Sequence, residues 1–133
     1  MLTDSPAKFL LVDDHESNLV ALSAVLSRDD VEMLRARSGR EALELLLQHD
    51  IALAVIDVQM PIMDGFELAE LMRGSRRTQH VPIIFLTAGP QDNLRRSRGY
   101  QAGAVDFLYK PIEPDVLRSK TGIFLDLYRQ REE

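Results

Sequence analysis

The segment at residues 51–56, IALAVI, most constrains the fold of this chain, because it is apolar at every position and is followed directly by Asp57. A strand with one face in solvent alternates polar and apolar residues, so a short unbroken apolar run indicates a strand covered on both faces. Strands of this kind are typical of parallel sheets with helices on either side. We therefore expect an α/β domain with residues 51–56 near the centre of its sheet.

Short apolar segments alternate with segments of helical periodicity along the whole chain. The expected strands are residues 9–12, 31–35, 51–56, 82–86 and 105–109, and the expected helices lie near 19–26, 42–47, 66–72, 91–102 and 114–130. Parallel neighbours require helical crossovers, which are right-handed. The sequence thus predicts a doubly wound, five-stranded parallel sheet sandwiched between helices.

One helix start has a clear local signal, since Ser38 stands three residues before Glu41 in a capping-box arrangement. Pro114 suits the first turn of the last helix, where its missing N–H costs nothing.

Length and composition restrict the class of protein. With 133 residues, 45% of them hydrophobic, the chain is expected to form a single domain over residues 1–133. No apolar run is long enough to span a membrane, and the N-terminal segment, residues 1–8, is too short and polar for a secretory leader. We therefore expect a cytoplasmic protein. The absence of cysteine excludes disulfides and thiolate metal sites. A net charge of -5 argues against direct nucleic-acid binding.

Polar side chains stand where four of the expected strands end. Asp13 and Asp14 follow the first strand, Asp57 the third, Thr87 the fourth and Lys110 the fifth. The carboxyl ends of parallel strands share one edge of the sheet, which is where ligands bind in such folds. An aspartate pair taken alone is as readily a helix N-cap, but four strand ends together favour a site. Three carboxylates in one place would repel one another unless a cation were present, and oxygen ligands suit magnesium, with manganese as the alternative.

Four segments resemble the response regulator receiver domains of two-component signalling, and in particular the chemotaxis regulators. They are VDDHESN at 12–18, VIDVQMPIMDG at 55–65, FLTA at 85–88 and DFLYKP at 106–111, so the resemblance covers nearly the whole chain. It implies a flavodoxin-like fold. Flavodoxin-like folds, among them a chemotaxis receiver, have the strand order 2-1-3-4-5. The expectation of this order rests on the resemblance and not on the residues alone.

The resemblance implies a magnesium site made by Asp13, Asp14, Asp57 and the backbone carbonyl of Gln59. Asp14 is expected to bind the ion directly, and Asp13 mainly through water.

The resemblance also implies a phosphorylation cycle. Asp57 is expected to accept a phosphoryl group from a histidine kinase or a phosphotransfer protein, with Lys110 binding the phosphoryl oxygens. Thr87 is the switch hydroxyl and Phe107 the aromatic whose rotamer follows phosphorylation. The Lys110–Pro111 peptide bond is expected to be cis.

The expected function is that of a phosphoacceptor switch that regulates a partner or output domain. It would catalyse its own phosphorylation and dephosphorylation and would not be an enzyme with a separate substrate. The sequence is also similar in style to receivers attached to hybrid histidine kinases.

Three other functions compete with this interpretation. A phosphorylation-independent interaction module of the same fold predicts loss of the acidic pair, the acceptor or the lysine, yet all are present. A flavin or dinucleotide enzyme needs a glycine-rich loop after the first strand, where this chain has DDHESN. A haloacid-dehalogenase-type phosphatase would have a second acid at the position of Gln59, and this function stays as a remote alternative.

The three histidines are interpreted as surface residues and not as ligands or phosphate relays. They are His15, His49 and His80.

The last helix has more apolar residues than one packed stripe requires. Val116, Leu117, Ile123, Phe124, Leu127 and Tyr128 form its expected apolar face, with Leu125 outside that face and Gly122 open to close approach by another backbone. We hypothesise that this helix contributes to a homodimer or extends into a neighbouring domain.

Overall fold

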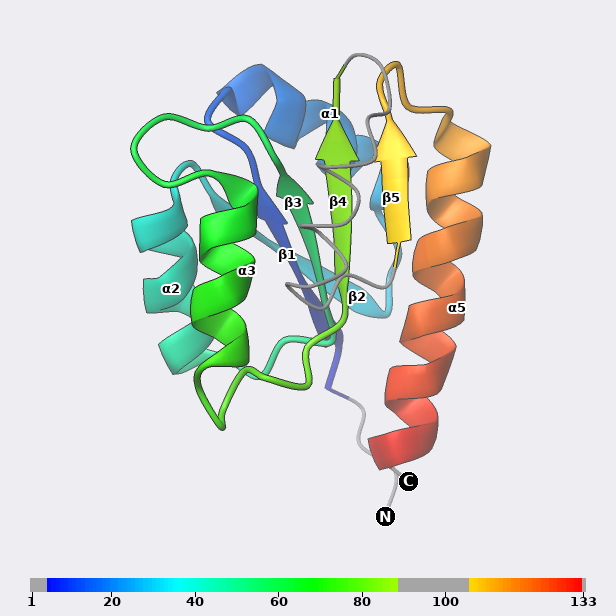
Figure 1. Cartoon of the computed structure of the whole chain (residues 1–133). Helices are drawn as coiled ribbons and strands as arrows, with labels where there is room; N and C mark the ends of the chain where they lie inside the picture. The colour runs from blue at the N-terminus through cyan, green and yellow to red at the C-terminus, as the bar shows by residue number, and fades with distance from the viewer. Residues whose placement is uncertain (1–4, 89–105, 133) are drawn as a thin grey trace.

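The sheet of this protein has the predicted topology. The computed structural model describes residues 5–88 and 106–132. Within that part, β1 (Ala7–Val12), β2 (Val31–Ala36), β3 (Leu53–Asp57), β4 (Ile83–Thr87) and β5 (Asp106–Tyr109) form one parallel sheet in the order β2-β1-β3-β4-β5 (Figure 1). The flavodoxin-like fold and its strand order are therefore confirmed. The helix expected near 91–102 lies outside the described residues.

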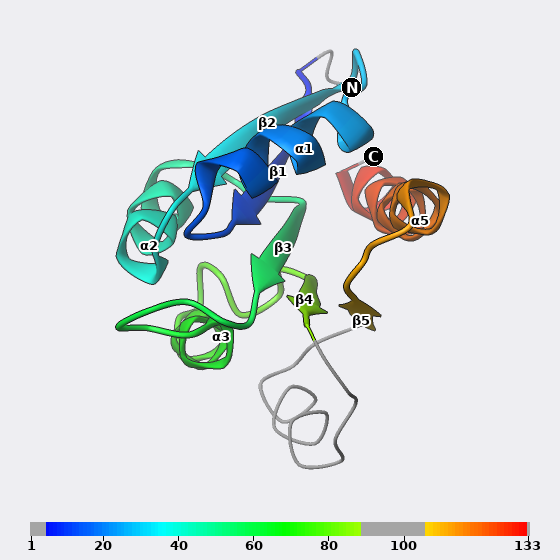
Figure 2. The same ribbon diagram turned by 90° about the horizontal axis from the view of Figure 1, so that it is seen from above.

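Helices cover both faces of the sheet (Figure 2). On one face lie α1 (Glu16–Leu26) and α5 (Pro114–Glu132), which contact each other; on the other lie α2 (Gly39–Gln48) and α3 (Gly65–Arg73). None of the described helices has both the length and the apolar character needed to cross a membrane.

The central strand β3 is buried along its entire length, as its unbroken apolar sequence predicted. Its alternate residues enter two different cores. Ala54 and Ile56 pack with α2 and α3, whereas Leu53 and Val55 pack with α1 and α5. The sheet therefore separates two apolar clusters and holds the strand ends in a fixed register.

Element boundaries differ from the predicted ones by a few residues, for two physical reasons. The strand expected at 51–56 starts at Leu53, because Ile51 and Ala52 are buried in the connection that precedes it and look like strand residues in the sequence. The helices α1 and α3 begin before their predicted starts, since a first helical turn is largely polar and falls outside an apolar periodicity, whereas α2 begins directly after its predicted cap, Ser38.

The helix caps were predicted in part. Ser38 caps α2 by accepting the Glu41 N–H at 3.1 Å, but the Glu41 carboxylate accepts the N–H of Arg37 instead of that of Ser38. A complete capping box begins α3, where Asp64 accepts the Glu67 N–H at 2.9 Å and Glu67 accepts the Asp64 N–H at 3.0 Å. The sequence analysis had not identified this second box.

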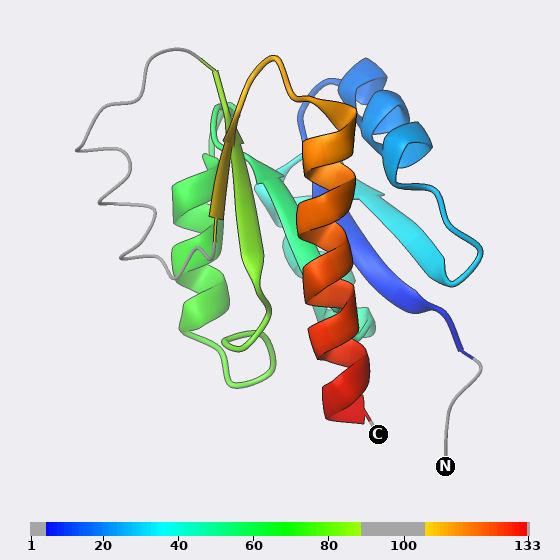
Figure 3. The same ribbon diagram turned by 90° about the vertical axis from the view of Figure 1, so that its right-hand side faces the viewer.

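The predicted apolar face of the last helix packs only in part: Leu117 is buried, and Phe124 and Tyr128 pack against the same core, but the placement of Leu125 was wrong. Leu125, which was placed outside that face, is 1% exposed, and it lies with Leu117 and Thr121 in the buried row. Val116, Ile123 and Leu127 are exposed. Figure 3 shows α5 lying along the sheet beside α1. The row spaced four residues apart is buried there, and the row starting at Val116 is exposed. Apart from the backbone of α5 itself, no atom of the described residues lies within 4 Å of a Cβ built on Gly122.

Candidate functional site

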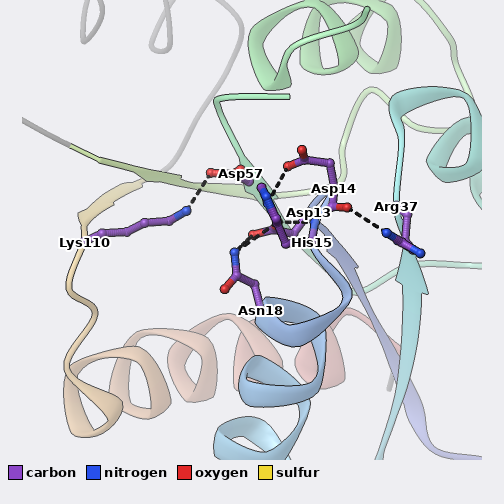
Figure 4. A network of polar contacts seen from close by, with 7 residues as sticks. All are labelled: Asp13, Asp14, His15, Asn18, Arg37, Asp57 and Lys110. Carbon is purple, nitrogen blue, oxygen red and sulfur yellow. Dashed lines mark hydrogen bonds and ion pairs between the residues drawn. The ribbon is translucent and has the colours of Figure 1, made fainter. Parts of the chain in front are cut away.

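The strand ends bring most of the predicted site residues together. Val12 pairs with Ile56 across β1 and β3, so Asp13 follows β1 beside Asp57 at the end of β3. Lys110 follows β5 and reaches back across the end of β4 to the same place (Figure 4). The carboxyl edge of the sheet therefore carries a cluster of acids with one lysine.

Asp57 is a buried carboxylate with one cationic partner. It is 3% exposed, and Lys110 Nζ donates to Asp57 Oδ1 at 3.1 Å. Burial raises the pKa of Asp57 above its usual value; the Lys110 ammonium opposes this shift, and the charges of Asp13 and Asp14 add to it. A cation placed among these acids would favour the ionised form of Asp57.

The backbone next to Asp57 depends on a close approach by α3. A Cβ on Gly65 would lie 2.6 Å from the carbonyl oxygen of Asp57, and the Gly65 N–H donates to the carbonyl of Val58 at 2.9 Å. Glycine is therefore required where α3 begins against the end of β3.

Asp13 is held in place by hydrogen bonds from α1 and its start. The side chain is 1% exposed; Oδ1 accepts the His15 N–H at 2.9 Å, and the Asn18 amide donates to Oδ1 and Oδ2 at 3.3 and 3.1 Å. Both oxygens of Asp13 thus already accept hydrogen bonds from the protein (Figure 4).

Asp14 differs from Asp13 because one of its oxygens lacks such a partner. Asp14 Oδ1 is shielded from solvent and accepts no hydrogen bond from the described residues, although His15 Nδ1 lies 3.2 Å from it. The backbone carbonyl of Asp14 accepts from Arg37 Nη2 at 3.2 Å. A buried carboxylate oxygen without a donor is costly unless a cation is close.

These features fit a divalent metal ion. Ligand atoms of Asp13, Asp14 and His15 all lie within 4.8 Å of one another. Oxygen-rich sites of this kind suit magnesium, whereas an imidazole ligand would favour a softer metal. Asp14 Oδ1 is the atom that such an ion would satisfy. Asp57 does not belong to this three-residue group, and Gln59 is exposed in the loop after β3.

Thr87 is the last residue of β4, and its carbonyl accepts the N–H of Lys110 at 2.8 Å. Its side chain is buried, and the hydroxyl lies 3.4 Å from the carbonyl of Ala88. The Lys110–Pro111 peptide bond is cis, as predicted.

Phe107 lies in the interior and not in solvent. It is 8% exposed and belongs to an aromatic series in which its ring centroid lies 5.5 Å from that of Phe85 and 6.5 Å from that of Tyr109. Phe85 in turn makes an edge-to-face contact with Phe66 of α3, at 4.9 Å. The inward position of Phe107 is therefore already filled in this structure.

The three histidines have different surroundings. His15 is exposed, as predicted, but its Nδ1 lies beside the acidic pair. His49 Nδ1 lies 3.0 Å from Lys8 Nζ, and His80 is exposed in the connection before β4.

Sequence reasoning missed two residues that hold the acidic pair. Asn18 has a local signal, because it stands one helical turn after Asp14 in the VDDHESN segment. Arg37 has none, since it donates to a backbone carbonyl 23 positions away in the chain.

A pocket of about 300 Å³ adjoins the acids between α1 and the connection from β5 to α5. Its rim includes Asp13, Asn18 and Lys110, and its wall is apolar, with Leu22, Ile112 and Leu117 among its residues.

A parallel sheet in this order, with an acidic pair, a buried aspartate and a lysine at its carboxyl edge, defines the receiver class of signalling domains. Comparison with known families gives the same answer, because the response regulator receiver domain model matches residues 9–121. The chain belongs to this family, and it is a phosphorelay receiver of two-component signalling. Phosphorylation and magnesium binding are typical of the family.

Curated relatives of the chain are considerably longer than it is. The response regulator PleD of Caulobacter vibrioides is 37% identical over 95% of this chain, and a probable cyclic di-GMP phosphodiesterase of Vibrio cholerae is 35% identical over 96% of it. The chain spans 29% of the length of each of these curated relatives. Among solved structures, the chemotaxis protein CheY4 of Vibrio cholerae has a TM-score of 0.83 and 30% identity, covering 90% of this chain and 99% of its own.

Proposed function

We propose that Asp57 is the residue that accepts the phosphoryl group, and that Asp13, Asp14, Lys110 and Thr87 assist. The observation that carries this proposal is the Asp57–Lys110 pair at 3.1 Å beside the acidic pair, at the carboxyl edge of the sheet. A nucleophilic oxygen, a cation for the phosphoryl oxygens and a metal site are the parts that phosphoryl transfer requires.

The residues have separate tasks in this reaction. A carboxylate oxygen of Asp57 attacks the phosphorus in line with the leaving group, and the Lys110 ammonium neutralises charge on the transferred oxygens. Burial keeps bulk water from the acyl phosphate that forms. By catalysing this transfer and the later hydrolysis itself, the domain acts as a switch and has no separate substrate.

A magnesium ion, with manganese as the alternative, would be held by Asp14 directly, by Asp13 through water, by Asp57 and by the carbonyl of Gln59. When bound, it supplies Lewis-acid neutralisation of the phosphoryl oxygens. The free Asp14 Oδ1 supports a direct role for Asp14, and the two occupied oxygens of Asp13 support an indirect one.

The response to phosphorylation would begin at Thr87. Its hydroxyl lies one residue beyond Leu86, which pairs with Asp57 across β3 and β4, and it would donate to an oxygen of the phosphoryl group. Movement of the Thr87 backbone would affect Phe107 through the neighbouring Phe85. Because Phe107 already lies inside, phosphorylation would stabilise this inward position at the expense of an outward one.

The phosphodonor would be a histidine kinase or phosphotransfer protein in the cytoplasm. The pocket between α1 and the β5–α5 connection supports docking here, because its apolar wall adjoins the acids and Lys110. The domain would function as part of a regulator or a hybrid histidine kinase, with residues 1–133 as one folding unit.

A homodimer through α5 is the second partner we propose. Val116, Ile123 and Leu127, which belong to the face predicted from the sequence, are exposed and could form this contact.

Acetyl phosphate and Mg²⁺ test the acceptor. Intact-mass measurement of wild-type protein should show one phosphoryl adduct, and Asp57→Asn should show none, since asparagine keeps the size but lacks the anionic oxygen. Lys110→Ala and Asp14→Ala should slow the reaction by at least about tenfold without moving its site, because the first removes charge stabilisation and the second removes a metal ligand. Their effects should be non-additive.

A matched control is Asp126→Asn, which changes an exposed aspartate on α5. Absence of any adduct on the wild-type protein, together with failure to bind beryllium fluoride, would contradict the acceptor role and favour a phosphorylation-independent interaction module. An adduct that persists in Asp57→Asn would place the acceptor elsewhere.

A further inference from the structure

The turn at residues 37–39 contacts both loops that carry the acidic site. Arg37 donates to the backbone carbonyl of Asp14, in the loop after β1, at 3.2 Å (Figure 4). Gly39, two residues later, faces Met63 in the loop after β3. We call residues 37–39 the bridging turn. Its two contacts reach the loop after β1 and the loop after β3.

Met63 lies so close to Gly39 that a larger residue at position 39 would require the flexible Met63 side chain to move. A Cβ at position 39 would lie 2.3 Å from Met63 Sδ and 2.9 Å from its Cγ. Met63 also packs on the core that α2 and α3 share. The thioether therefore fastens the loop after β3 to the start of α2.

The loop needs such an anchor because its backbone is strained one residue earlier. Ile62 has φ 71°, and the Met63 N–H donates to the Pro61 carbonyl at 2.8 Å, so Ile62 is the centre of a γ-turn with positive φ. A β-branched residue rarely adopts this conformation. The side chain of Ile62 is fully exposed and makes no core contact that could compensate. Met63 is the neighbouring residue that does.

The bridging turn is itself held firmly. The Arg37 N–H donates to the Glu41 carboxylate at 2.9 Å, and Ser38 Oγ accepts the Glu41 N–H at 3.1 Å. The Ala36 carbonyl, directly before the turn, accepts the Asp13 N–H at 3.1 Å. The turn is thus fixed to α2 and to the end of β1, and its position sets the positions of both loops.

We propose that the bridging turn fixes the separation between Asp14 and the loop after Asp57, and that Arg37 and Met63 are positioning residues for the metal ligands. This inference rests on the proposed function, because it assumes that Mg²⁺ binds at Asp13, Asp14 and Asp57. Arg37 acts through the backbone of Asp14, and Met63 acts through the loop that contains Gln59.

The Arg37 contact is tested by titrating Mg²⁺ into folded protein and following backbone amide chemical shifts. Arg37→Ala should raise the Mg²⁺ dissociation constant about tenfold, the lower end of the effect of losing a group that orients a metal ligand. Arg40→Ala is the matched control, because Arg40 is 90% exposed and its ion pair is with Glu44 of the same helix, not with a residue of the site. Removing a positive charge near an acidic site by itself strengthens cation binding. The control should therefore bind Mg²⁺ at least as tightly as wild type, and weaker binding by Arg37→Ala cannot be ascribed to its lost charge.

The Met63 contact is tested by a compensation cycle in the same assay. Gly39→Ala and Met63→Ala should each weaken Mg²⁺ binding, whereas Met63→Leu, which conserves volume, should retain most of it. The double variant should bind no worse than Met63→Ala alone, because the added methyl group then occupies the vacated space. Urea unfolding of each variant separates stability from affinity.

Two outcomes overturn the inference in different ways. Variants that lose stability but bind Mg²⁺ with wild-type affinity would show that the bridging turn is only structural, and the proposed function would stand. Wild-type protein that binds no Mg²⁺ would overturn the proposed function and this inference together.

Discussion

Asp57 holds a negative charge in a place where burial disfavours it. The carboxylate is almost wholly buried, two other acids lie near it, and among the described residues Lys110 is the cation that pairs with it. Lys110 is about one-third exposed and can remain hydrated without Asp57. The site therefore has a carboxylate whose ionised form is favoured chiefly by added positive charge, and this links metal binding to the readiness of the nucleophile.

Asp57→Asn should stabilise the metal-free fold at pH 7, by about 1 kcal/mol, since the cost of burying the charge exceeds the value of one partly exposed ion pair. The folded-state pKa of Asp57 is raised above its ordinary value of 3.8, so the folded protein binds this proton more tightly than the unfolded chain. The contribution of Asp57 to stability is thus greatest below pH 3.8 and decreases as the pH rises through the raised pKa.

Urea unfolding of wild type and Asp57→Asn across this pH range measures the effect. The difference should shrink as the pH falls, and Mg²⁺ should stabilise wild type more than the variant. A variant that is less stable than wild type at pH 7 would show that the Lys110 pair outweighs burial. Asp126→Asn, at an exposed position, is the control.

At the scale of single elements, α5 shows why the sequence alone placed Leu125 on the wrong face of the helix. The exposed row, starting at Val116, is as apolar as the buried one, because Thr121 lies in the buried row with its hydroxyl bonded to the carbonyl of Leu117 at 2.9 Å. A threonine that satisfies its hydroxyl within its own helix can be buried. The apolar count alone therefore gave no reason to choose Leu125.

Truncation of the two leucines distinguishes the faces. Leu125→Ala should lower the free energy of unfolding by about 2–5 kcal/mol, since it leaves a cavity in the core beneath α1 and α5. Leu127 is 49% exposed, and Leu127→Ala should change stability by no more than about 0.5 kcal/mol. Chemical denaturation of both variants provides the measurement. Equal losses of unfolding free energy in the two variants would show that Leu127 also belongs to the packed face of α5.

The doubly buried strands and the strand-end acids could be predicted from sequence because their signals are local. An apolar run such as that before Asp57 records burial on both faces, and parallel strands bring their ends to one edge whatever the connections contain. The contacts of Arg37 and Met63 could not be predicted in this way. One uses a backbone carbonyl and the other the absence of a side chain at Gly39, and neither leaves a residue pattern.

At the scale of the whole molecule, the exposed row of α5 leaves apolar surface in solvent. Val116 is 38% and Ile123 56% exposed, on the same helix face as Leu127. Three side chains provide only part of the roughly 800 Å² per partner that a stable interface buries. Self-association through this row should therefore be weak without phosphorylation. It should strengthen if phosphorylation adds a further contact surface to the interface.

Sedimentation velocity, with and without beryllium fluoride and Mg²⁺, tests this expectation. Ile123→Lys should reduce any dimer, because it places a charge in the centre of the exposed row. Val20→Lys alters a similarly exposed apolar residue on α1 and should leave the dimer unchanged. A monomer under both conditions at high protein concentration would rule out the α5 dimer.

The division of the interior by the sheet also has an evolutionary consequence. Side chains under α2 and α3 are separated by the strand backbones from those under α1 and α5, so the two sets do not contact each other through the sheet. A substitution that changes volume on one side can be accommodated by its own neighbours without altering those on the other side. Lineages of this domain can therefore remodel the α1–α5 side, next to the pocket beside the acids, while the α2–α3 side that supports the bridging turn keeps its residues.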